Sequence, residues 1–192
     1  TKEKLKEIKD SIEVLPDQRK KTYMDSYSLT AYEADKLVSE KFIADFYEEA
    51  VKEGSAKLVA NLMLSEVFRL LGKEEEAEKI PFAPSKLGVL AKRIEEDVIS
   101  QSMAKKIVEL LWKSDKDVDE IIEKEDMRQI TDVALLEGII SKLIAENEDI
   151  VSSYKAGKEK AFQALVGSVM RQTKGKASPS LTAKILSELI TK

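Results

Sequence analysis

The sequence predicts an all-α protein. Almost every segment repeats its apolar residues with helical periodicity, and no run alternates apolar and polar residues as a strand does. Aromatic residues make up only 6% of the chain, whereas charged residues make up 35%. This composition favours helices over strands. With 43% hydrophobic residues in 192, the chain is long enough for one or two globular domains with buried cores.

Capping residues predict the first helices. Pro16 fits the first turn of a helix, and Thr30 with Glu33 forms a capping-box pattern that predicts a long amphipathic helix to about Lys52. Gly54 and the following serine then break this run and start another helix.

The helices of the middle region follow the same signals. The helix after Gly54 is expected to end at Gly72, where glycine can close a helix. Apolar residues at four, eight and eleven positions after Val59 predict one buried side of this helix. They are Met63, Val67 and Leu70. Further helices are predicted from about Ser85 after the loop at Pro81 and Pro84, from Ser100 to Trp112, and within residues 115–125.

A boundary is predicted between Lys124 and Gln129, which divides the chain into a helical domain, 1–125, and a tail domain, 126–192. The tail is expected to be a small bundle of three or four helices. Its helices are predicted from Thr131-Asp132 to about Ala145, from Asn147, from Lys158 to about Thr173, and from Ser178-Pro179.

The end of the chain is basic. Residues 151–192 hold eight Lys or Arg and two acids, a net charge of +6, whereas the whole chain carries −4, so residues 1–150 carry −10. A basic end on an acidic body indicates an anionic partner for that end.

One predicted helix, 158–173, divides this basic end into two faces. An apolar face is expected in the core: Ala161, Phe162, Leu165, Val166, Val169 and Met170. Lys160, Gln163, Gly167, Arg171 and Lys174 recur on the other face. Glycine within a helix costs about 1 kcal/mol relative to Ala, a cost consistent with another backbone approaching closely. A solvated charged face, with Gly167 helping helices to pack, is an equal alternative.

The turn after this helix could also hold an anion. Lys174-Gly175-Lys176 precedes a helix start, where free N–H groups and the positive end of the helix dipole would meet two lysines. The alternative, an ordinary turn with lysines for solubility, is favoured for the motif alone. The spacing of a P-loop is absent.

Several chemistries are excluded or disfavoured. The chain contains no Cys and no His, so it lacks thiolate chemistry, the usual general base and the usual zinc ligands. Acidic runs at 74–76, 95–97 and 115–119 are interpreted as solvated loops, so we expect no catalytic residue and no metal site. No apolar run is long enough to span a membrane. The start at Thr1 leads us to expect a part of a longer protein.

Tyrosines near the start of the chain also form a pattern. Tyr23, Tyr27 and Tyr32, together with Arg19, recur at helical spacing. Such a cluster usually packs at a domain edge. Stacking on RNA bases is the less favoured interpretation.

The motifs together resemble one family, the B subunits of the aspartyl/glutamyl-tRNA amidotransferase, GatB. The resemblance runs from about Leu15 to Ile190 and its tail motif is specific. The matching residues are Leu15-Pro16, Arg19, Tyr23, Tyr27, Leu29, Tyr32, Ala34, Leu37, Ala44, Phe46-Tyr47-Glu48, Lys57, Ala60-Asn61, Ile99-Ser100, Ala104-Lys105, Gln129-Ile130, Asp132, Tyr154-Lys155, Gly157-Lys158, Val166-Gly167, Val169-Met170, Thr173-Lys174-Gly175-Lys176-Ala177 and Pro179.

The chain departs from the family at scattered positions. The family usually has Trp where Leu62 stands and Gly near Asp97 and near Asp126. Gln, Lys and Asn are usual where Ser168, Arg171 and Ser178 stand. None of these differences removes the basic face.

The resemblance implies a fold and a function. It implies a helical domain followed by a YqeY-like tail, without the N-terminal cradle domain that carries out phosphorylation and amidation with ATP and Mg²⁺. The parent complex, GatCAB, is a cytoplasmic ligase that makes Gln-tRNA(Gln) and often Asn-tRNA(Asn), with glutamine as ammonia donor. The A and C subunits are expected partners through the cradle. This chain would bind the outer corner of the tRNA and would not be an enzyme on its own.

The expected tRNA contacts combine the resemblance with the basic face. They are Lys155, Lys158, Lys160, Gly167, Arg171, Lys174, Gly175 and Lys176. The alternative function is a protein–protein interaction module whose basic tail binds an acidic protein surface.

Overall fold

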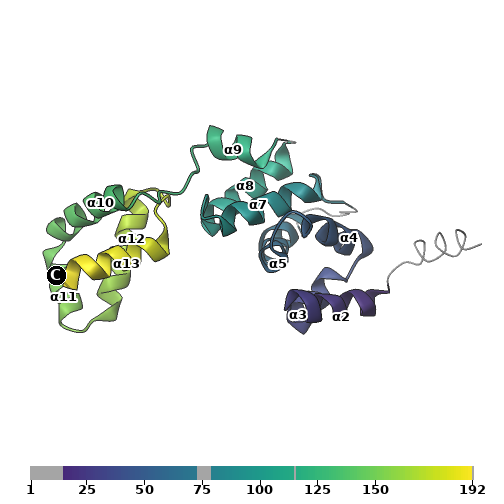
Figure 1. Cartoon of the computed structure of the whole chain (residues 1–192), viewed down its shortest axis with the longest axis horizontal. Helices are drawn as coiled ribbons and strands as arrows, with labels where there is room; N and C mark the ends of the chain where they lie inside the picture. The colour runs from purple at the N-terminus through teal and green to yellow at the C-terminus, as the bar shows by residue number, and fades with distance from the viewer. Residues whose placement is uncertain (1–14, 73–78, 115, 192) are drawn as a thin grey trace, which may run out of the picture. The chain divides into compact units, whose positions relative to one another are not determined.

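The computed structural model describes residues 15–72, 79–114 and 116–191. Within these residues every regular segment is helical, as predicted, and extended pairing is limited to a parallel bridge between Ile130 and Ala177 (Figure 1). They form two compact units, the first from 15–72, 79–92 and 111–114 and the second from 93–110 and 116–191. The acidic residues 74–76 and Asp115 lie outside the described residues. None of the described helices is long and apolar enough to cross a membrane.

The first two helices of the first unit begin where the sequence predicts. Helix α2 spans Pro16–Tyr27 and helix α3 spans Ala31–Leu37. At the start of α3, the hydroxyl of Thr30 accepts a hydrogen bond from the backbone N–H of Glu33 at 3.3 Å. The Glu33 carboxylate accepts one from the Thr30 N–H at 2.7 Å. The predicted capping box is confirmed.

The long helix predicted to continue to about Lys52 is wrong. The chain leaves helical geometry after α3, and a separate helix, α4, spans Lys41–Ala50. The hydroxyl of Ser39 donates to the carbonyl oxygen of Lys36 at 2.8 Å, and Glu40 is extended, with φ −140° and ψ 144°. A local hydroxyl–carbonyl bond of this kind competes with the helical hydrogen-bond ladder.

The next helix contains a π-helical turn. Helix α5 (Ala56–Leu62) continues through the π-helix η1 (Met63–Val67) into α6 (Phe68–Leu71), with Gly72 following as predicted. Its predicted apolar side is buried at Val59, Met63 and Val67, whereas Leu70 is only partly buried. A π-turn inserts an additional residue into the helix, so the residues beyond it face a different direction from those of a regular helix.

Two glycines bring backbone segments of the first unit into contact. Gly54 precedes α5, and Gly88 lies in α7 (Pro84–Glu95). A Cβ atom on Gly54 would lie 2.2 Å from the carbonyl oxygen of Gly88, and one on Gly88 would lie 2.2 Å from that of Ala50. Only glycine therefore fits at either position.

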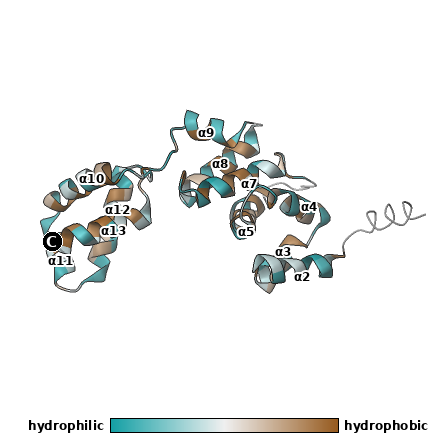
Figure 2. Cartoon of the chain, in the orientation of Figure 1, coloured by the Kyte–Doolittle hydropathy of each residue, from teal (hydrophilic) through white to brown (hydrophobic). Residues whose placement is uncertain are grey.

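The second unit includes most of α8 (Gln101–Lys113), α9 (Val118–Lys124) and the tail helices. The tail contains α10 (Val133–Glu146), α11 (Glu148–Lys155), α12 (Glu159–Gln172) and α13 (Pro179–Thr191), close to the predicted ranges. Figure 2 shows the apolar residues along α10, α12 and α13. Their shared core consists of Leu136, Ile140, Leu143, Leu165, Val169, Ala177, Ile185, Leu186 and Ile190.

A short connection joins α9 to the tail. The N–H of Gln129 donates to the carbonyl oxygen of Val98 at 2.7 Å, and the N–H of Ile130 donates to that of Lys176 at 2.6 Å. Backbone hydrogen bonds therefore tie this connection to two other segments of its own unit. The boundary predicted between 125 and 126 stays a prediction.

Candidate nucleic-acid interface

Helix α12 has one buried and one exposed face, as predicted. Leu165 and Val169 are fully buried in the tail core, with Phe162, Val166 and Met170 packed partly against it. The opposite face exposes Lys160, Gln163, Gly167 and Arg171. With 14 residues, α12 is about 20 Å long, so this face presents a row rather than a single point.

Gly167 lies in the middle of that exposed row. A Cβ atom built on it would meet nothing within 4 Å. Within its own unit, Gly167 therefore does not bring two helices into contact. Another molecule could approach the α12 backbone at this point without meeting a side chain.

The turn before α12 presents Lys155 and Lys158. Lys155 ends α11, Gly157 adopts φ +90°, and Lys158 is the N-cap residue of α12. Both lysines are exposed. They lie near one end of α12, whereas Arg171 and Lys174 lie near the other.

The turn after α12 has a left-handed backbone. Lys174 and Gly175 both have positive φ, 53° and 79°. Their N–H groups donate back to the end of α12: Lys174 to Arg171 O at 3.1 Å and Gly175 to Met170 O at 2.7 Å. The N–H groups of Lys176 and Ala177 donate to Thr173, at 3.0 Å to its carbonyl and 3.2 Å to its hydroxyl. The N–H groups of the turn are therefore occupied, because this left-handed ending satisfies the last carbonyls of α12. These bonds do not involve the N–H groups at the start of α13, so the expected anion site there stays a prediction.

The cations of this surface differ in their pairing. Within the described part of the chain, Lys155, Lys158, Lys160, Arg171 and Lys174 form no ion pair. Lys176 differs from them, because its ammonium group pairs with the Asp126 carboxylate. We call Lys155, Lys158, Lys160, Gly167, Arg171, Lys174, Gly175 and Lys176 the basic face.

Arginines outside this surface are neutralised within the chain. Arg93 binds both carboxylate oxygens of Asp119 at 2.7 Å and Glu96 at 2.6 Å, which lowers the pKa of Asp119 below its usual range. Arg19 binds Asp45 at 2.6 Å. The unpaired cations of the basic face would instead take their counter-charge from solvent ions or from another molecule.

Comparison with known proteins identifies the family. A family model described as the GatB domain matches residues 45–190. The chain is 37% identical over 183 residues, 94% of its length, to the B subunit of the aspartyl/glutamyl-tRNA(Asn/Gln) amidotransferase from Halorhodospira halophila. The chain belongs to the GatB domain family.

Further GatB relatives match over the whole chain. The protein of the same name from Thermoanaerobacter sp. is 40% identical, and that from Carboxydothermus hydrogenoformans is 37% identical, each over 100% of this chain. The matches cover 38% to 41% of the relatives' own length, so the chain spans about two fifths of each relative.

The structure explains two places where the chain departs from the GatB pattern. The family's glycines are expected near Asp97 and Asp126, and these residues have φ of 54° and 51°. A positive φ is the conformation that glycine adopts without strain, and Asp tolerates it better than most residues. Asp97 and Asp126 therefore adopt a backbone conformation that glycine would adopt without strain.

The tyrosine cluster of this GatB domain differs from the prediction. Tyr23 and Tyr27 stack at 6.0 Å between ring centroids, and Tyr47, not Tyr32, packs edge-on against Tyr23 at 4.9 Å. Burial and a hydrogen bond to Glu48 raise the pKa of Tyr23. Tyr32 is instead 68% exposed, with the Lys36 ammonium 5.8 Å from its ring centroid.

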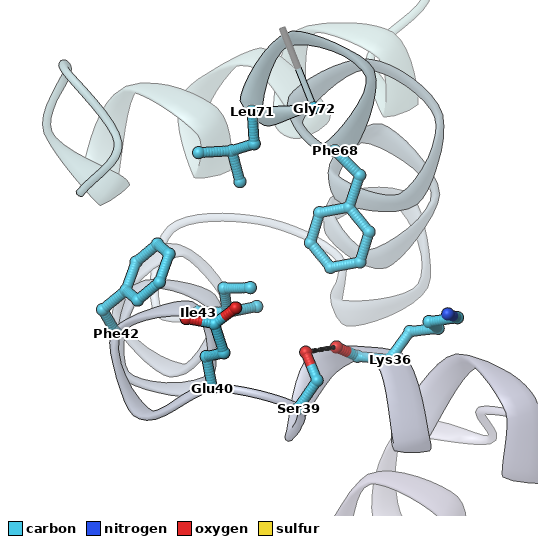
Figure 3. Close-up of a pocket in the computed structure, with 8 residues that line it drawn as sticks. All are labelled: Lys36, Ser39, Glu40, Phe42, Ile43, Phe68, Leu71 and Gly72. Carbon is cyan, nitrogen blue, oxygen red and sulfur yellow. Dashed lines mark hydrogen bonds between the residues drawn. The ribbon is translucent and has the colours of Figure 1, made fainter. Parts of the chain in front are cut away.

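Sequence reasoning also missed a pocket of mixed polar and apolar lining in the first unit of this GatB domain. It has a volume of about 400 Å³, and Figure 3 shows Phe42, Phe68 and Leu71 around it. Its lining comes from α3, the break before α4, α4 and the segment from α6 to Gly72. The break before α4 has no periodic signal in the sequence.

Proposed function

We propose that this chain is the tRNA-binding portion of the B subunit of a glutamyl-tRNA(Gln)/aspartyl-tRNA(Asn) amidotransferase. In this proposal the basic face contacts phosphates at the outer corner of the tRNA and positions the mischarged tRNA for transamidation in the cytoplasm. The names of the relatives support the enzyme, and the unpaired cations around Gly167 support the RNA. A folded RNA presents shape and phosphates more than base edges, which suits a row of cations beside an open backbone.

The observation that carries the proposal is the exposed face of α12. Its cations lack partners among the described residues, and Gly167 lies between Lys160 and Arg171 with nothing in front of it. A lysine-rich face needed for solubility alone would be compatible with any side chain at residue 167. A phosphate backbone that approaches the helix closely would favour the smallest one.

We propose that the chemical reaction takes place outside this chain. Among the described residues, no group of three or more acidic residues is arranged to hold a metal ion. The Mg²⁺ and ATP of the parent enzyme and the glutamine-dependent step would belong to the rest of the B subunit and to the A subunit, with the C subunit as a further partner. In this proposal the role of this chain is binding.

The test is tRNA binding measured against salt. Fluorescence anisotropy with labelled tRNA would compare the chain with Arg171→Ala, Lys174→Ala and the control Lys142→Ala. Lys142 is an exposed cation on α10, so this control changes the charge equally. Each of the first two substitutions should weaken binding and reduce the slope of log affinity against log salt by about 0.7–0.9.

Two outcomes would contradict the proposal. Unchanged tRNA affinity in both Arg171→Ala and Lys174→Ala would refute the basic face as the contact surface. Equal affinity for tRNA and for an unrelated polyanion such as heparin would favour the alternative, in which the tail binds an acidic protein surface.

A further inference from the structure

One cation of the basic face is paired with a carboxylate of this chain. Lys176 belongs to the turn after α12, and Asp126 follows the end of α9, 50 residues earlier. Their side chains form an ion pair, whereas Lys174, two residues from Lys176, has no ion-pair partner in the described ranges. The turn therefore presents one available cation and one that is neutralised.

Backbone hydrogen bonds fix both partners of this pair. Asp126 has φ +51°, its N–H donates to Glu123 O at 3.2 Å, and the next N–H, of Met127, donates to Ile122 O at 2.9 Å. This pattern is a common way to end a helix, here α9. On the other side, the carbonyl of Lys176 accepts from the N–H of Ile130 at 2.6 Å. The two backbone segments are thus held near one another, with their side chains within reach of an ion pair.

The surrounding charges leave Asp126 as the partner of Lys176. The neighbouring acid Glu123 pairs with Arg128. The side chain of Lys176 is 26% exposed, whereas that of Asp126 is 84% exposed. An ion pair this accessible is worth only about 0.2–1 kcal/mol, so a phosphate group could replace the carboxylate.

We infer that Asp126 is an autoinhibitory positioning residue for the basic face: its carboxylate occupies Lys176 until an RNA phosphate displaces it. This inference rests on the proposed function, because it concerns how the same surface takes its ligand. Bound RNA would contact both Lys174 and Lys176, with Gly175 between them. The carboxylate would be released into solvent beside the bound RNA.

The decisive variant is Asp126→Asn. Asparagine keeps the shape of the side chain and tolerates positive φ, but it removes the charge. Binding of labelled tRNA should become about 1.5- to 5-fold tighter at low salt, which corresponds to the strength of an exposed ion pair. The gain should shrink as salt screens the competing pair.

Two controls separate this effect from a general loss of negative charge. Asp97→Asn makes the same change at another exposed residue with positive φ, and it should leave tRNA affinity within the range of a distant charge effect. In a Lys176→Ala background, Asp126→Asn should give a smaller gain than in the wild-type chain, because no ion pair remains to be broken.

The outcomes distinguish this inference from the proposed function. If Arg171→Ala weakens tRNA binding but Asp126→Asn changes it no more than Asp97→Asn does, the competing role of Asp126 is refuted and the proposed function stands. Equal gains from Asp126→Asn with and without Lys176 refute it as well. Absence of salt-dependent tRNA binding by the wild-type chain refutes both.

Discussion

Gly167 illustrates how a single residue can separate stability from binding. It lies within α12, where glycine weakens a helix, and nothing in the described structure requires its small size. Gly138 of α10 is in the same situation, exposed in a helix with open space in front of it. The two glycines differ in their surroundings, since only Gly167 lies among the cations of the basic face.

Substituting each glycine by Ala should therefore give a paired result. Gly167→Ala and Gly138→Ala should each raise the free energy of unfolding by about 1 kcal/mol, because both helices gain propensity. Only the first should weaken tRNA binding, and Gly167→Leu should weaken it further. Urea unfolding and tRNA titration would measure the two properties. Full tRNA affinity in Gly167→Leu would show that no backbone approaches there.

Thr182 gives a second prediction at this scale. It is fully buried in α13, and its hydroxyl has no hydrogen-bond partner among the described atoms. A buried hydroxyl without a partner costs about 1–3 kcal/mol. Thr182→Val should therefore raise the free energy of unfolding by about 1 kcal/mol in urea denaturation. A loss of stability would show instead that a water molecule satisfies this hydroxyl.

At the scale of the element, the start of α3 combines a cap with an ion pair. Glu33 accepts hydrogen bonds from the backbone and hydroxyl of Thr30, and Lys57 contacts both of its carboxylate oxygens at 2.8 Å. These contacts, the Lys57 bond first, lower the pKa of Glu33 below its usual range. The charged form is thus the one that stabilises the fold.

This lowered pKa predicts a pH-dependent contribution to stability. It is fully present above the unfolded-state pKa of about 4.3 and is lost as pH falls through the lower folded-state value. Glu33→Gln should lower the free energy of unfolding by about 1 kcal/mol at neutral pH, and this difference from the wild-type chain should shrink as pH falls below the unfolded-state value. Thermal unfolding from acid to neutral pH would measure this, with the exposed Glu137→Gln as control. If Glu33→Gln stays less stable than the wild-type chain at acid pH, the loss comes from the altered hydrogen bonds of the side chain rather than from its charge.

At Gly88, where α7 contacts the segment before α5, replacing glycine by Ala should lower stability rather than raise it. Gly88→Ala should lower the free energy of unfolding by about 2 kcal/mol or more, because its Cβ atom would overlap the carbonyl oxygen of Ala50. Guanidinium unfolding beside Gly138→Ala, which gains stability, would show the contrast. Tolerance of Ala at Gly88 would mean that the helices separate easily.

The sequence predicts elements well where the signal is local. The helix starts at Thr30, Ser100 and Asp132 are confirmed. At each one, the side-chain oxygen accepts a hydrogen bond from the backbone N–H three residues later, so the signal is local. The break before α4, the π-turn and the approach of Gly54 to Gly88 depend on packing between distant segments, so no local pattern indicates them. The exposed row of α12 follows from periodicity. The pairing of Lys176 with Asp126 does not, since 50 residues separate them.

At the scale of the whole molecule, the charge is distributed unevenly along the chain. The final 42 residues carry +6 while the chain as a whole carries −4. A polyanion such as tRNA is therefore repelled by most of the chain and attracted by its end. This distribution favours one binding orientation over random association.

Crosslinking would test that orientation. Chemical crosslinks from bound tRNA, mapped by mass spectrometry, should concentrate on α12 and its two flanking turns rather than on α2–α6. Added salt should reduce the tail crosslinks most steeply, because those contacts are electrostatic. A comparable yield on α2–α6 would show that the RNA lies along the whole chain.

The open surroundings of Gly138 have a practical consequence. Because the chain has no cysteine, a thiol introduced by Gly138→Cys would be its unique attachment point for a dye. The dye would extend into space that no described side chain fills, on α10 rather than on the basic face. Energy transfer from such a dye to a labelled tRNA would follow the arrival and departure of the RNA in real time.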